Sequence, residues 1–511
     1  MAIVDWVFLG LYFALLIVIG VQTIRRIETP EDFAVAGNRI IWPVFFGSLA
    51  ASFLGGGSSL GNAGQTFTDG YVYMFAFYAF AIQTVLVGYF VAPRLKRYAN
   101  AQTVGDIMEN HYGSTARLLT GILSVAVCAG ILGAQALAVG TIFNTILGVS
   151  TTVGILIGMS IVVLYSTFGG VWAVIQTDML QFVFLGVFVP VTLIIGLIKV
   201  GGPAELMASM PDAHLSFMGN WTAGLFVSVF LAFLLGETLV PPYTQRAFST
   251  PDPASARKGY VVSGVFAFFY FFVSASIGLV ALALYPNISP DQAVPTVVKN
   301  VVPVGLVGLV VAALLAVVMS TASSYLNSIA VVFVKDIYQP FIDPNVPASR
   351  KVWLERGLSL VVGGAAILFA VSVPSIVDAL LYSYALWAPT VIIPLILAVM
   401  WGFRSKAAAL SAIVAGGGVD LGPERALRHH RPGGGSGGER GGVRGSLQGC
   451  RRRETLRPGG GLGREVRRSE HLCLAPVRRA HRGYPRDPLR GVSGLQVLRR
   501  RGGEEVAGRR I

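Results

Sequence analysis

The stretch SFLGGGSSLG, Ser52–Gly61, places three consecutive glycines and two serines inside a long apolar segment. Glycine costs a helix about 1 kcal/mol relative to alanine. In a lipid bilayer a broken helix is tolerated only where it is buried in protein or lines a cavity. The break frees carbonyl groups that can bind a cation, and glycine lets a ligand approach the backbone. We therefore predict that the helix is interrupted over Gly55, Gly56, Gly57, Ser58 and Ser59, at a binding site.

Two other interpretations of this stretch stay open. Small residues also occur where two membrane helices pack closely against each other. A phosphate-binding loop needs a preceding strand and usually ends in Gly-Lys-Ser/Thr, and the sequence has neither feature here.

The composition indicates a polytopic, all-α membrane protein. The chain has 511 residues, of which 54% are hydrophobic and 13% charged, and its mean hydropathy is +0.66. Soluble domains are about 25% charged. Apolar runs with the length of a membrane-spanning helix recur along the sequence. The first run, near Ala2–Ile24, has an acidic residue, Asp5, close to its start and is followed by two basic residues, Arg25 and Arg26. This charge order is opposite to that of a secretory signal, so we expect the helix to be retained.

Eleven complete apolar helices are predicted, and a twelfth begins near Lys406. We expect helix 3–24 to be peripheral, 40–199 and 219–401 to form two repeats of five helices, and 406–415 to be a truncated helix. An odd number of helices per repeat makes the two repeats inverted in topology. The predicted helices are 3–24, 40–66, 71–93, 118–147, 151–167, 171–199, 219–240, 257–284, 301–335, 353–373 and 376–401.

The distribution of positive charge predicts the orientation. If the loops alternate and the N-terminus lies outside, one side receives all the Lys and Arg residues of 1–415 except Lys199 and Lys299. The side rich in positive charge is cytoplasmic by the positive-inside rule. We expect an integral protein of the bacterial plasma (inner) membrane.

A second interruption is predicted in FLLGETLVPPYTQR, Phe233–Arg246. Gly236, Pro241 and Pro242 are unfavourable inside a helix, and Glu237 is an ionisable group at membrane depth, which indicates function. Alternatively, the helix ends at Pro241 and Glu237 caps or pairs near the interface. Because both interruptions fall in the first helix of a repeat, their matching positions favour a transport site.

A polar cluster in the ninth helix indicates a cation site. The segment VVMSTASSYLNS, Val317–Ser328, contains six polar side chains within an apolar helix. Hydroxyl groups often bond back to their own helix, but six exceed what packing needs. A hard cation such as Na⁺ prefers neutral oxygen ligands of this kind, by analogy with other hard cations.

The segment 416–511 differs from the body of the chain. It holds 22 Arg, no Lys, 9 Asp and Glu, 23 Gly and a single aromatic residue, Tyr484. Such a segment cannot bury enough apolar surface to fold. It suits a nucleic-acid or anionic-lipid arm, but the abrupt change favours a reading-frame error. We therefore expect a disordered tail and no nucleic-acid partner, and another reading frame of the DNA should continue the twelfth helix.

Catalytic and metal motifs are missing from the sequence. We find no HExxH, GxSxG or His/Asp constellation and predict that the protein is not an enzyme. If the tail is out of frame, His429, His430, Cys450 and Cys473 carry no information. The remaining cysteine, Cys128, is expected to be a buried thiol, and no disulfide framework is predicted.

Three segments together resemble the sodium/solute symporter family. YSTFGGVWAVIQTDMLQ, Tyr165–Gln181, is similar to the family signature, although Val171 replaces the usual Leu, Met or Phe. EDFAVAGNR, Glu31–Arg39, is similar to the first cytoplasmic loop, and VMSTASSYLNS to the sodium-site helix. The resemblance covers about 1–415 and implies the inverted-repeat fold of the leucine transporter. Family members have further helices after this core.

The resemblance also implies individual site residues. The sodium ligands would be the carbonyl groups of Ala51, Leu54 and Val317 and the hydroxyl groups of Ser320 and Thr321, with Asp178 on the sodium path. Where sugar carriers have polar residues, this chain has Gly56, Gly57 and Ser58, so a small amine, zwitterion or carboxylate is favoured over a sugar. The substrate-binding residues expected from both arguments are Gly55, Gly56, Gly57, Ser58 and Glu237.

The leading functional hypothesis is a sodium-coupled symporter that transports a small organic solute by alternating access, with Na⁺ as the co-transported ion. The alternative is a membrane sensor or receptor that retains the transporter fold, but no kinase or receiver domain is visible. The paired helix interruptions disfavour a channel. The expected partners are the solute and the lipid bilayer. The sequence leaves the solute, the Na⁺:solute ratio and the oligomeric state open.

Overall fold

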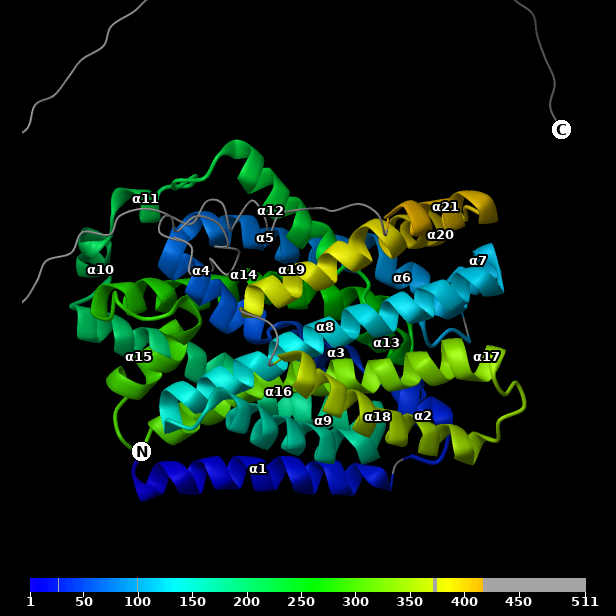
Figure 1. Ribbon diagram of the computed structural model, residues 1–511, viewed down its shortest axis with the longest axis horizontal. Helices are drawn as coiled ribbons and strands as arrows, with labels where there is room; N and C mark the ends of the chain where they lie inside the picture. The colour runs from blue at the N-terminus through cyan, green and yellow to red at the C-terminus, as the bar shows by residue number, and fades with distance from the viewer. Residues whose placement is uncertain (26, 99, 371–374, 417–511) are drawn as a thin grey trace, which may run out of the picture. The chain divides into compact units, whose positions relative to one another are not determined.

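A computed structural model describes residues 1–416 except 26, 99 and 371–374 (Figure 1). Within these residues the regular elements are all helices, in agreement with the predicted class. Apart from Gly416, the segment 416–511 lies outside the described residues, as does the prediction that it is disordered.

The helices follow one another through short connections. In the N-terminal half they are α1 (Ile3–Ile24), α2 (Pro30–Val35), η1 (Ala36–Asn38), α3 (Trp42–Phe53), η2 (Gly57–Gly61), α4 (Asn62–Asp69), α5 (Tyr71–Leu86), η3 (Val87–Val91), α6 (Ala92–Leu95), α7 (Val104–Tyr112), α8 (Ser114–Leu147), α9 (Thr151–Val200), α10 (Pro203–Ser209) and α11 (Asp212–Leu215). In the C-terminal half they are α12 (Ala223–Gly236), α13 (Pro241–Ser249), α14 (Pro253–Leu284), η4 (Pro290–Gln292), α15 (Ala293–Val301), α16 (Val307–Val332), η5 (Phe333–Tyr338), α17 (Gln339–Phe341), α18 (Ala348–Ala370), α19 (Ile376–Trp387), η6 (Ala388–Ile392), α20 (Ile393–Trp401) and α21 (Lys406–Gly416).

Seven of the described helices are long and apolar enough to cross a membrane, and the number is up to nine if each of two bent pairs is one span. One pair joins Pro30–Asn38 to Trp42–Phe53 at 115°, and the other joins Ala223–Gly236 to Pro241–Ser249 at 43°. The sequence predicts eleven. Part of the difference arises because two of the predicted helices form one element, α9.

In α9 the structure joins the predicted helices 151–167 and 171–199 at Gly170. This residue has φ 52° and ψ −154°, a conformation that a residue with a side chain adopts only under strain. A Cβ atom at Gly170 would also lie 2.7 Å from Cδ2 of Phe33 in α2. Glycine therefore allows both the kink and the close approach of α2.

The glycine-rich stretch interrupts its helix, as predicted. The helix α3 ends at Phe53, Leu54 leaves the helical conformation with φ −82° and ψ 52°, and helical structure resumes at Gly56. The chain then continues through the π-helix η2 into α4. The break therefore occupies Leu54 and Gly55, at the start of the predicted site.

The second interruption consists of the four residues that precede the two prolines, 237–240. The helix α12 ends at Gly236, Leu239 adopts φ 55°, and Pro241 occupies the first turn of α13. Proline suits this position because its missing N–H would have no partner in the first turn. Residues 241–249, which the sequence analysis placed in a loop, are therefore helical.

The helix with the polar cluster lies at the centre of the fold. The helix α16 packs mainly against α9 and α8 and also contacts α1, α3 and α13. Every residue of α16 except Leu309 is buried. The polar side chains of Val317–Ser328 are therefore held inside protein, where they need internal partners.

Candidate functional site

Both helix interruptions contribute to the wall of one buried cavity. Its volume is about 10 Å³, roughly the space that one water molecule needs. Four of the five predicted substrate-binding residues line it, and Gly56 lies beside it in the same break. The lining residues are Phe53, Gly55, Gly57, Ser58, Phe77, Phe80, Gln135, Glu237, Thr321, Leu380 and Tyr384.

Side chains replace the backbone hydrogen bonds that the first break leaves unmade. Gln135 in α8 accepts a hydrogen bond from the Gly56 N–H at 2.7 Å. The Ser58 hydroxyl donates to the Phe53 carbonyl at 2.8 Å. These bonds hold the break in place without continuing the helix.

Glycine at the first break allows the close approach of α16. A Cβ atom at Gly55 would lie 2.5 Å from the Thr321 Oγ1 atom and 2.8 Å from the Gln135 Oε1 atom. Real Cβ atoms do not come so close to a neighbour without a shift. The Thr321 hydroxyl therefore lies against the interrupted backbone, as the resemblance implies for a sodium ligand.

The structure brings most of the predicted sodium ligands within hydrogen-bonding distance of one another. The Ser320 hydroxyl donates to the Ala51 carbonyl at 2.7 Å and to the Val317 carbonyl at 3.0 Å. The Thr321 hydroxyl donates to the Val317 carbonyl at 3.3 Å. Leu54 is the first residue after α3, and all five residues are buried. The arrangement is a set of neutral oxygen atoms around a helix break.

Asp178 in α9 lies in a buried ionic network next to this set. Its Oδ2 atom accepts hydrogen bonds from Ser48 at 2.6 Å and from Arg246 at 2.8 Å. Arg246 also donates to Ser324 at 2.6 Å, and Ser324 donates to the Ser320 carbonyl at 2.7 Å. The network connects Asp178 to the helix that carries the predicted sodium ligands.

Glu237 lies at the second break and accepts two hydrogen bonds from tyrosine hydroxyl groups. Tyr243 donates to its Oε2 atom at 2.6 Å, and Tyr384 donates to its Oε1 atom at 2.7 Å. The Glu237 side chain is buried and reaches the cavity. Glu237 therefore lies inside the helix bundle, at the C-terminal end of α12.

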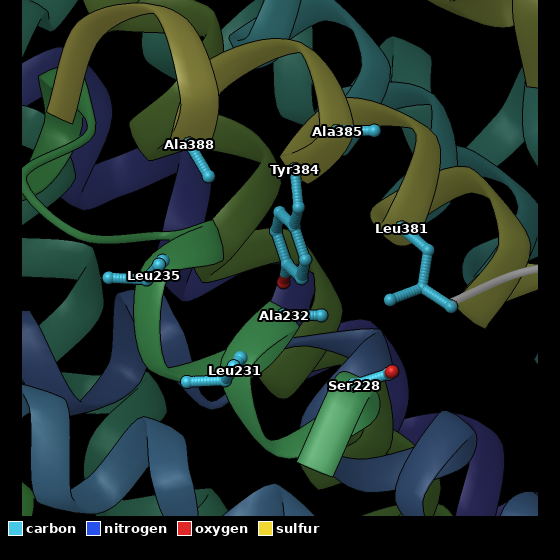
Figure 2. Close-up of a pocket in the computed structure, with 8 residues that line it drawn as sticks. All are labelled: Ser228, Leu231, Ala232, Leu235, Leu381, Tyr384, Ala385 and Ala388. Atoms are coloured by element: carbon cyan, nitrogen blue, oxygen red, sulfur yellow. The ribbon is translucent and has the colours of Figure 1, made fainter. Parts of the chain in front are cut away.

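A larger apolar pocket lies on the other side of Tyr384. Its volume is about 230 Å³. The Tyr384 ring projects from α19 toward α12, with aliphatic side chains of both helices around it (Figure 2). Tyr384 lines both this pocket and the small cavity at Glu237, so its side chain separates the two spaces.

The sequence analysis does not identify three residues that contribute to this region, Gln135, Arg246 and Tyr384. Gln135 is a lone polar residue in the apolar segment ILGAQALAVG, Ile131–Gly140, and that signal could have identified it. Arg246 was assigned to a cytoplasmic loop because it follows two prolines. Tyr384 gives no local signal, since a tyrosine in an apolar helix is common in a protein core.

The comparisons with known proteins agree with the geometry. A family model, the sodium:solute symporter family, matches residues 33–416. The chain is 27% identical to the uncharacterized symporter YidK of Escherichia coli over 68% of this chain and 65% of that protein. It is 24% identical to the high-affinity choline transporter 1 of Drosophila melanogaster over 74% of this chain and 62% of that protein. The chain thus spans slightly less than two thirds of the length of these relatives.

A solved structure shows the same fold. The structure of a Na⁺-coupled sialic acid symporter in a substrate-bound, outward-open state aligns with a TM-score of 0.70 at 19% identity, over 83% of this chain and 98% of that one. The transporter fold implied by the sequence is therefore confirmed. The family match covers most of the chain and includes both helix interruptions and the polar cluster of α16, so this chain belongs to the sodium:solute symporter family.

Proposed function

We propose that this protein is a sodium-coupled symporter that carries a small organic solute into the cell by alternating access. The observation that carries the proposal is that both helix interruptions line one buried cavity, whose wall also includes Thr321 from the polar cluster of α16. Broken helices at the centre of a membrane bundle provide free backbone groups for ions and solutes.

The proposed sodium site consists of the carbonyl groups of Ala51, Leu54 and Val317 and the hydroxyl groups of Ser320 and Thr321. Its support is the 2.7 Å hydrogen bond from the Ser320 hydroxyl in α16 to the Ala51 carbonyl in α3, and the position of Thr321 beside Gly55 in the break. Na⁺ would replace these internal hydrogen bonds with contacts to several oxygen atoms at once. Asp178 would attract the ion along its path, since its network ends at the Ser320 backbone.

The energetics are sufficient for accumulation of a solute. One Na⁺ that enters gains about 2.3 kcal/mol per 100 mV of membrane potential. Because each tenfold ratio of solute concentrations across the membrane requires about 1.4 kcal/mol, this free energy supports roughly fiftyfold accumulation of the solute inside the cell. The proposed orientation places the N-terminus outside, in the plasma (inner) membrane of a bacterium.

The proposed solute site contains Gly55, Gly56, Gly57, Ser58 and Glu237. The relatives are named for solutes as different as choline and sialic acid, so the family leaves the solute of this chain open. The polar side chains of the cavity wall are Ser58, Gln135, Glu237, Thr321 and Tyr384. The preference for a small amine, zwitterion or carboxylate over a sugar rests on Gly56, Gly57 and Ser58, which stand where sugar carriers have polar residues.

Transport is tested with the purified protein in liposomes. An inward Na⁺ gradient should drive accumulation of radiolabelled solutes from a panel of amines, zwitterions, carboxylates and sugars. An equal K⁺ gradient should not, and an ionophore that dissipates the Na⁺ gradient should release the accumulated solute. Equilibration without accumulation would indicate a channel, and Na⁺-dependent binding without uptake would indicate a sensor.

A further inference from the structure

We propose that Glu237 binds a positively charged nitrogen of the solute, so that the substrates are small organic molecules with an ammonium group. This inference rests on the proposed function and narrows its solute class. It assigns a role to the buried carboxylate at the second break and to the aromatic rings beside it.

The first argument is the charge of Glu237. Its side chain is 6% exposed, and within the described residues no Lys, Arg or His forms an ion pair with it. Asp178, which is also buried, is paired with Arg246 at 2.8 Å. A buried charge without a partner is strongly unfavourable. An ionised Glu237 therefore requires a cationic partner from outside the described part of the protein.

The second argument concerns the protonation of the carboxylate. Both carboxylate oxygens accept a hydrogen bond, one from Tyr243 and one from Tyr384. Hydrogen bonds donated to a carboxylate stabilise its ionised form. The two tyrosine hydroxyls therefore oppose the effect of burial, which favours the protonated acid, and support a carboxylate that a bound cation would stabilise further.

The third argument separates an organic cation from a second Na⁺. The cavity at Glu237 is lined by the rings of Phe53, Phe77, Phe80 and Tyr384. The ring centroids of Phe53 and Phe80 are 5.5 Å apart, and the ring centroids of Phe77 and Phe80 are 6.1 Å apart. Aromatic faces attract ammonium groups, whereas Na⁺ prefers several oxygen ligands. The neutral oxygen atoms gather instead at Ser320 and Thr321.

The fourth argument is space. The cavity at Glu237 is small, but Tyr384 lines both this cavity and the apolar pocket between α12 and α19. A rotation of the Tyr384 side chain, which would exchange its hydrogen bond to Glu237 for the bound cation, would open the cavity toward that pocket. The ammonium group would then lie at Glu237 and the hydrocarbon part of the solute against Leu381 and the exposed side chains of Leu231 and Leu235.

The test uses pairs of probes that differ at the nitrogen. The ammonium probes are choline, glycine betaine and β-alanine. Their counterparts without the charged nitrogen are 3,3-dimethylbutan-1-ol, 3,3-dimethylbutanoate and propanoate. Binding is measured as the thermal stabilisation of the purified full chain, in saturating NaCl and in KCl of equal concentration. We expect at least one ammonium probe to stabilise the protein in NaCl and its counterpart to have no effect.

The variants assign the effect to Glu237. Glu237→Gln should raise the Kd of the ammonium probe by about 30-fold or more, as for removal of one partner of a buried charge pair. Glu355→Gln is the matched control, because Glu355 is also buried but lies in α18, outside the cavity lining. Phe77→Leu should weaken binding by roughly 2- to 30-fold through loss of one ring. The Phe77→Leu variant also tests the proposal on its own if the Glu237→Gln protein does not fold.

Three results would overturn this inference. The first is that no ammonium probe binds, or that the counterparts bind equally well. The second is that Glu237→Gln keeps the wild-type affinity. The third is that Glu237→Gln loses the stabilisation by NaCl itself, which would make Glu237 a sodium ligand. The proposed function fails separately, if NaCl gives the wild-type protein no more stabilisation than KCl.

Discussion

Ser320 and Thr321 are neighbours in α16. The Ser320 hydroxyl donates to the Ala51 carbonyl near the first break, and the Thr321 hydroxyl donates to Val317 of its own helix and lies beside Gly55. Removal of one hydroxyl takes a ligand from a desolvated ion, a loss of about 1–3 kcal/mol. We expect Ser320→Ala and Thr321→Ala to raise the Na⁺ concentration for half-maximal uptake by roughly 5- to 150-fold. Because coupling is reciprocal, the apparent solute affinity at fixed Na⁺ should weaken as well.

Ser323 provides the control for this prediction. Its hydroxyl donates to the Ser320 carbonyl of its own helix at 3.0 Å, and Ser323 is also buried. Ser323→Ala should therefore keep the wild-type Na⁺ dependence of uptake. If Ser320→Ala and Thr321→Ala also keep it, the proposed sodium site is wrong.

Gly57 lies in the lining of the small cavity, and a Cβ atom there would clash with the Leu380 side chain. Gly57→Leu should fill the cavity and abolish solute binding and uptake, because the cavity has room for little more than one water molecule. Uptake is measured together with the amount of protein in the membrane. Gly10→Leu in α1, where no atom lies within 4 Å of an added Cβ, should leave both unchanged. Normal uptake by the Gly57→Leu variant would show that the solute binds elsewhere in the protein.

The kink of α9 depends on one glycine. Gly170→Ala forces a side chain into a left-handed conformation, which costs about 1–2 kcal/mol, and places it against Phe33. We expect a lower midpoint of thermal unfolding in detergent. The control is Gly186→Ala in the same helix, where an added Cβ meets no atom within 4 Å, and where the change should be neutral or stabilising. Equal midpoints for the two variants would show that the kink does not require glycine.

The buried ion pair of Asp178 and Arg246 connects four helices, since its hydrogen bonds join α9 and α13 to Ser48 in α3 and Ser324 in α16. Removal of one partner leaves a buried charge uncompensated, at a cost of about 3–5 kcal/mol. Arg246→Met should therefore strongly destabilise the protein against heat. The double variant with Asp178→Asn should recover much of this loss.

Arg39 and Asp32 form the comparison for this pair. Their charged atoms are 3.7 Å apart, and the Arg39 side chain is 71% exposed. Arg39→Met should change stability by at most about 1 kcal/mol, as for other exposed ion pairs. A similar effect of Arg39→Met and Arg246→Met would contradict a structural role of the buried network.

The sequence determined the class of the protein and the places where its helices break. These features could be predicted because they follow from local physical chemistry. A bilayer demands long apolar helices, glycine is unfavourable inside a helix, and proline is tolerated only in its first turn. The polar cluster of α16 was visible for the same reason, since hydroxyl groups are rare in an apolar span. The roles of the five proposed sodium ligands and of the solute-site residues stay predictions.

Only the tertiary structure decided which side chains meet at the breaks. Gln135, Arg246 and Tyr384 come from α8, α13 and α19, which are far apart in the sequence. Their contacts depend on how the helices pack, and no local periodicity encodes that arrangement. The same holds for the partners of Glu237. The sequence placed an ionisable group in the membrane, but the packing of α12, α13 and α19 gave it two tyrosine hydroxyls and, among the described residues, no basic partner.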